Sequence, residues 1–89
     1  MKSEGLSMNT RVELDHGRGK YYLVDLFPIK WTEFISSAKN FSSPEEARSM
    51  LNTRLYQLSE ILTQDMISAI EIVTLENGVE INRERYIGR

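Results

Sequence analysis

The sequence predicts an α+β protein with an antiparallel sheet of about four strands, in ββαββ order, and one long amphipathic helix packed on one face. A helix-start signal at residues 42–46 is followed by apolar residues at helical spacing as far as residue 65. The segments on either side alternate with the period of strands, and Asn77-Gly78 indicates a two-residue hairpin turn. A helix laid across an antiparallel sheet is the simplest packing of these elements.

Length and composition indicate one small globular domain. We expect residues 1–8 to be a flexible N-terminus and residues 9–89 to form a single domain. The chain has no cysteine, which excludes disulfides and thiolate metal sites. No apolar run approaches the roughly 20 residues of a membrane span, so we expect a cytoplasmic protein that does not bind membranes. The net charge of −2 disfavours nucleic-acid binding by the chain as a whole.

Residues 9–15 and 20–27 predict a first hairpin. Asp25 is expected to face water, which turns Tyr22, Val24 and Leu26 to the core and leaves Tyr21, Leu23 and Phe27 on the other face. Pro28 lacks a backbone donor and is expected to stop the pairing. Residues 29–41 fit both helical and strand spacing, and we expect a short helix or an irregular crossing segment there.

The helix is predicted to begin at a capping box, with Ser43 as N-cap, Pro44 at the first position and Glu46 three residues after the cap. Its apolar residues fall on one arc, and about 21 helical residues, roughly 31 Å, suggest that one end overhangs the sheet. Arg54 falls inside this arc. Two interpretations are open: its side chain snorkels to keep the charge in water, or it pairs with a carboxylate in a packed interface. Tyr56 falls on the side of the helix opposite the arc, where it is either an ordinary exposed aromatic or an interface anchor. The arc consists of Ala47, Met50, Leu51, Leu55, Leu58, Ile61 and Leu62.

Residues 67–75 and the residues after the Asn-Gly turn predict a second hairpin. A two-residue turn sets Leu75 opposite Glu80 and Thr74 opposite Ile81. In this register Ile81 joins Ile70, Ile72 and Thr74 on one face, and Val73 joins Leu75 on the other.

The sheet face that the helix leaves uncovered is the predicted functional surface. An apolar patch of several hundred Å² normally marks an interface. Either residues 29–41 fold back over this face, or the register is off by one, or the face binds a second copy or another protein. The predicted partner or dimer surface consists of Tyr21, Leu23, Phe27, Val73 and Leu75, with Tyr56 on the helix.

Two other kinds of site are weaker. His16 is the only histidine, next to Asp15, and no second catalytic or metal-binding partner can be named, so we expect no enzyme, no cofactor and no metal. The predicted function is a small non-enzymatic protein–protein interaction module, of regulator, adaptor or inhibitor type, with self-association through the uncovered face as one mode. The alternative is a nucleic-acid-binding module, although glutamates share the same strands. Its predicted residues are Arg11, Arg18, Lys20, Arg83, Arg85, Tyr86 and Arg89.

Overall fold

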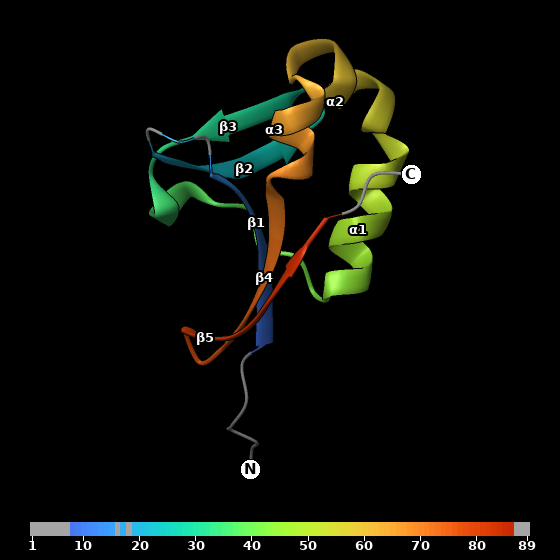
Figure 1. Ribbon diagram of the computed structural model, residues 1–89. Coiled ribbons are helices and arrows are strands. Elements are labelled where there is room, and N and C mark those ends of the chain that lie inside the picture. The colour runs from blue at the N-terminus through green and yellow to red at the C-terminus, as the bar shows by residue number, and fades with distance from the viewer. Residues whose placement is uncertain (1–7, 16, 18, 87–89) are drawn as a thin grey trace.

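The computed structural model describes residues 8–15, 17 and 19–86, which form one antiparallel five-stranded sheet with helices against one face (Figure 1). This confirms the predicted α+β class, but the described residues contain one more strand and two more α-helices than expected. The α-helices are α1 (Pro44–Thr53), α2 (Leu55–Ile61) and α3 (Gln64–Ser68), and η1 (Ile35–Ser37) is a 3₁₀ turn. The strands are β1 (Met8–Asp15), β2 (Lys20–Leu26), β3 (Ile29–Thr32), β4 (Ile70–Glu76) and β5 (Val79–Arg85).

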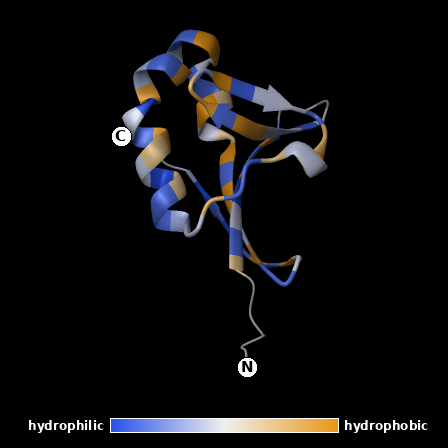
Figure 2. Ribbon diagram, turned by 180° about the vertical axis from the view of Figure 1, so that it is seen from behind, coloured by the Kyte–Doolittle hydropathy of each residue, from blue (hydrophilic) through white to orange (hydrophobic). Residues whose placement is uncertain are grey.

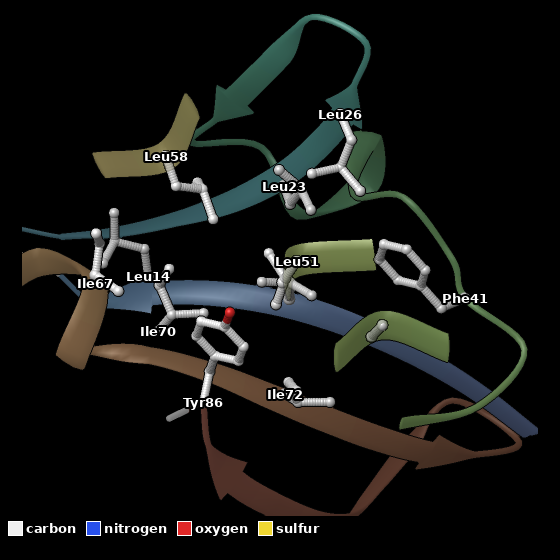
Figure 3. Close-up of a cluster of buried hydrophobic side chains, with 12 residues drawn as sticks. Leu14, Leu23, Leu26, Phe41, Leu51, Leu58, Ile67, Ile70, Ile72 and Tyr86 are labelled. Carbon is white, nitrogen blue, oxygen red and sulfur yellow. The ribbon is translucent and has the colours of Figure 1, made fainter. Parts of the chain in front are cut away.

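The strand order of the sheet is β3-β2-β1-β4-β5, and the core lies between the helices and the three inner strands β2, β1 and β4. Val12 and Leu14 of β1 pair with Ile72 and Ile70 of β4, and all four side chains are buried. Figure 2 shows hydrophobic and hydrophilic residues alternating along the helices, as amphipathic helices require. The helices add Ala47, Leu51, Leu58 and Ile67 to the same cluster (Figure 3).

A β-bulge in β2 changes which residues face the core. Leu23 pairs with Trp31 of β3, and the register then shifts between Leu23 and Asp25. Because of the extra residue, Leu23 and Leu26 both lie in the core, and both are fully buried. The expectation that Leu23 lies on the uncovered face was therefore wrong, since it assumed unbroken alternation along the strand.

Residues 29–41 begin with a strand, the less favoured of the two sequence interpretations. Pro28 lies in the turn after β2, and β3 then pairs back against β2. After η1 the chain crosses towards β1, where Phe41 forms an isolated bridge with Thr10. Phe34 and Ile35 remain exposed, so they do not cover a sheet face as the fold-back alternative required.

The start of α1 confirms the predicted cap. Ser43 Oγ accepts the Glu46 amide at 3.1 Å, and Pro44 occupies the first helical turn. The Glu46 carboxylate reaches back to the amide and hydroxyl of Ser42, one residue before the cap. Most of the predicted apolar arc is buried or partly buried against the core, with Ile61 as the exposed exception.

The predicted long helix is instead bent at Arg54 and ends at Ile61. The Thr53 hydroxyl donates to the Ser49 carbonyl at 2.9 Å, a bond that often bends helices. Arg54 has φ −106° and ψ 17°, and helical bonding resumes when the Leu58 amide donates to its carbonyl. At the end of the helix that was predicted to overhang the sheet, Leu58 is fully buried, whereas Ile61 is 56% exposed.

A separate short helix, α3, occupies the start of the predicted third strand. The Thr63 hydroxyl caps it by accepting the Met66 amide at 3.2 Å. Ile67, predicted as the first strand residue, is a buried residue of this helix, and β4 begins only at Ile70.

The β4–β5 hairpin has the predicted turn but a different register. Asn77 and Gly78 both have positive φ, as a type I′ turn requires, and Leu75 faces Glu80 as predicted. A bulge then sets Thr74 opposite Asn82 instead of Ile81. Ile81 therefore leaves the core face and is 51% exposed.

Candidate protein-interaction surface

The sheet face opposite the helices is covered with charges, so the predicted apolar patch does not form there. Val73 lies in register between Arg11 of β1 and Arg83 of β5. Aliphatic arginine stems can shield such a side chain from water, and Val73 and Leu75 are both buried. Tyr21 pairs with core-facing Leu14 and so lies on the helix side of the sheet, away from Val73.

Glu13 is the centre of this charged face, and its side chain is only 2% exposed. Its carboxylate lies 2.7 Å from Arg11 Nε, 3.0 Å from Arg83 Nη1 and 3.5 Å from Lys20 Nζ. Arg83 also pairs with Glu71 and Glu80, which balances three cations with three carboxylates. Burial raises the pKa of Glu13, but the hydrogen bonds from Arg11 and Arg83 outweigh it and leave that pKa below its ordinary value.

The predicted nucleic-acid residues are therefore mostly engaged within the protein. Arg11, Lys20 and Arg83 all belong to the Glu13 network. Tyr86 is 1% exposed and donates its hydroxyl to Asn52 Oδ1 at 2.6 Å, so its ring is not available for base stacking. Arg85 is exposed, while Arg18 and Arg89 lie outside the described residues.

An exposed aromatic ring lies at the turn between β2 and β3. The Asp25 carboxylate accepts the amides of Leu26 at 2.7 Å and Phe27 at 3.3 Å, and these bonds lower its pKa. Leu26 is fully buried and pairs with Ile29, which anchors the turn on the core. Phe27 is 60% exposed, so the anchored turn presents its ring to solvent.

Arg54 joins the bend between α1 and α2 to this turn. Its Nε donates to the Leu26 carbonyl at 3.0 Å, and its guanidinium carbon lies 4.3 Å from the centroid of the Phe27 ring. We call the exposed Phe27 ring and the guanidinium over it the Phe27–Arg54 site. Sequence reasoning singled out each residue separately, but nothing local indicates a contact between positions 27 residues apart.

The Arg54 guanidinium still has hydrogen-bonding capacity. Within the described part of the chain, its two Nη atoms have no hydrogen-bond or ion-pair partner. Neither atom is among the buried polar atoms without a partner, so both remain in contact with solvent. The guanidinium is thus fixed at Nε and over Phe27 but open at its outer edge.

Tyr56 belongs to a different part of the surface. It is 72% exposed and lines a groove of about 400 Å³ between α2 and α3, together with Leu55, Ser59, Gln64 and Ile67. Of the six predicted partner-surface residues, Tyr21, Phe27 and Tyr56 are accessible, and Leu23, Val73 and Leu75 are buried. The accessible three lie on β2, the β2–β3 turn and α2, so they do not share one sheet face.

Among the residues that the structure describes, no group of three or more His, Asp or Glu side chains could hold a metal ion, and His16 is outside that set. No helix in the described part of the chain is long and apolar enough to cross a membrane. Comparison with known proteins gave no matching family model, no matching curated protein and no matching solved structure.

Proposed function

We propose that this protein is a small non-enzymatic protein-interaction module that binds its partner through the Phe27–Arg54 site. The observation that carries the proposal is the exposed Phe27 ring held under the Arg54 guanidinium at 4.3 Å. Arginine, tryptophan and tyrosine are over-represented among the residues that carry most of the binding energy at protein interfaces, and phenylalanine is also enriched in interfaces. An exposed ring and a half-buried arginine, already fixed in one geometry, are well suited to that role.

The surroundings of the pair support this proposal, because they limit its motion before binding. The Asp25 carboxylate holds the turn, buried Leu26 anchors it, and the Leu26 carbonyl holds Arg54. Side chains that are ordered in the free protein lose less conformational entropy on binding, and this favours affinity.

Neither of the other two modes has comparable support. Self-association was expected through an apolar sheet face, but that face carries the Glu13 network of balanced charges. Nucleic-acid binding needs cations free to neutralise phosphates, and three of the predicted cations, Arg11, Lys20 and Arg83, are paired with glutamates. A protein partner at the Phe27–Arg54 site therefore remains the preferred function.

Selection from a random twelve-residue peptide library on the immobilised full chain tests the proposal. We expect enriched peptides that bind the wild-type protein and lose most of their affinity for Phe27→Ala. Tyr56→Ala is the matched control, since it removes another exposed aromatic from a different element. Enriched peptides that bind Phe27→Ala as well as wild type, or no enriched peptide, would overturn the proposal.

A further inference from the structure

The outer edge of the Arg54 guanidinium indicates what the partner presents. A guanidinium carries five N–H donors, of which Nε–H is used by the Leu26 carbonyl. The remaining donors belong to the two Nη atoms, which have no partner within the described residues and are not buried. Such a pair of nitrogens matches the two oxygens of a carboxylate in a bidentate contact.

We propose that the partner segment places a carboxylate against the Arg54 Nη atoms and an apolar side chain against the Phe27 ring. This inference depends on the proposed function, because it names the chemistry of the partner at the same site. The two contacts are adjacent, because the guanidinium carbon lies 4.3 Å from the centroid of the ring. The occupant is an acidic peptide segment with an apolar residue beside its Asp, Glu or terminal carboxylate.

The charges nearby favour a carboxylate over a more highly charged anion. Asp25 belongs to the same turn and remains ionised to lower pH than usual, because two backbone amides donate to it. Its charge repels a phosphate dianion more strongly than a single carboxylate. The chain also carries a net charge of −2, which adds to this preference.

A double-mutant cycle across the contact tests the inference. The tightest-binding Phe27-dependent peptide from the library is synthesised in two side-chain forms, one with its acidic residue and one with the isosteric amide (Glu→Gln or Asp→Asn). Each form is also made with a free and with an amidated C-terminus. Binding of these fluorescein-labelled forms is measured by anisotropy. On wild-type protein we expect the exchange of one carboxylate for an amide to weaken binding about tenfold or more. On Arg54→Gln the same exchange is expected to change binding less than about twofold.

Two controls separate the possible failures. Arg85→Gln removes an exposed arginine elsewhere and is expected to preserve the full effect of the carboxylate. If Arg54→Gln does not fold, Arg54→Lys replaces it, and the comparison of acid and amide peptides on wild-type protein still decides. This inference is overturned if the Phe27-dependent peptides lack a carboxylate. It is also overturned if exchange of the carboxylate for an amide weakens binding equally on wild type and on Arg54→Gln. Either result leaves the proposed function standing. Loss of Phe27 dependence overturns the proposed function itself.

Discussion

Arg54 and Phe27 are in contact, and this contact joins the bend of the helical layer to an exposed turn of the sheet. The guanidinium carbon lies 4.3 Å from the ring centroid, and Nε of the same side chain holds the carbonyl of Leu26. The contact therefore serves the fold, by tying α1 and α2 to β2, and also orients the exposed ring. Substitutions at the two positions separate these roles.

Arg54→Ala is expected to lower the free energy of unfolding by about 1–3 kcal/mol, because it removes a charged hydrogen bond and a cation–π contact. Phe27→Ala is expected to cost less than about 1 kcal/mol, since the ring is mostly exposed and only the stacking is lost. Urea denaturation followed by circular dichroism measures both, with Arg85→Ala as the surface control. A larger loss for Phe27→Ala than for Arg54→Ala would contradict the assigned roles.

The Glu13 network is expected to make stability depend on pH. The pKa of Glu13 is lower in the folded state, so its contribution is present above its unfolded pKa and is lost as the pH falls through the lowered folded value. Wild-type stability should therefore decrease as the pH falls below about 5. The midpoint of urea-induced unfolding, determined at several pH values between 7 and 2.5, measures this decrease.

Glu13→Gln isolates the contribution of that carboxylate. The substitution leaves Arg11 and Arg83 without their shared buried partner, and we expect a loss of about 2–4 kcal/mol at pH 7. The loss should shrink between pH 7 and pH 2.5, because Glu13 of the wild type takes up a proton as the pH falls through its lowered pKa. An equal difference between the two proteins at both pH values would show that Glu13 is not the titrating group. Glu76→Gln, at the half-buried end of β4 and outside the Glu13 network, is a suitable control.

The bulge in β5 predicts different effects for two isoleucines of the same hairpin. Ile81→Thr should change stability by less than about 0.5 kcal/mol, because Ile81 is 51% exposed. The matched Ile72→Thr should cost about 2–4 kcal/mol, because it removes buried apolar contacts and buries a hydroxyl. Thermal melts of the two variants compare them directly. Similar losses would favour the register without the bulge.

The hydroxyl of Tyr86 should contribute to docking of the chain after β5 against α1. Tyr86→Phe removes the donor to Asn52 and is expected to cost about 0.5–1.5 kcal/mol. A double-mutant cycle with Asn52→Ala measures the coupling between the two side chains. Strictly additive effects would mean that the hydrogen bond is not formed in solution.

Local signals in the sequence predicted much of the fold. The Ser43 cap, the burial of Ala47 and Leu51, and the Asn77-Gly78 turn each depend on residues close together in the chain. Such signals act through backbone geometry and short-range periodicity, so one sequence is enough to recognise them.

The failures share a different cause. Single-residue bulges in β2 and β5 moved Leu23 into the core and Ile81 out of it. Alternation of apolar residues does not reveal where a strand gains one residue, because the bulge is decided by pairing with distant strands. The predicted interface lost Leu23 for this reason, while Val73 and Leu75 are buried on a face that carries the Glu13 network.

The candidate site was predictable only in part. Arg54 was recognised as unusual because it fell inside the apolar arc, and Phe27 was expected to be exposed on a partner surface. Their contact depends on the bend of the helix and on the β2–β3 turn, both of which require the tertiary structure.

The central claim is that the Phe27–Arg54 site binds a protein partner, and binding of one selected peptide to three proteins tests it most directly. Anisotropy titrations would compare wild type, Phe27→Ala and Tyr56→Ala, after thermal melts confirm that all three are folded. We predict that Phe27→Ala weakens binding about tenfold or more, while Tyr56→Ala binds within about twofold of wild type. Unchanged binding by Phe27→Ala, or a loss confined to Tyr56→Ala, would contradict the claim and place the interface elsewhere.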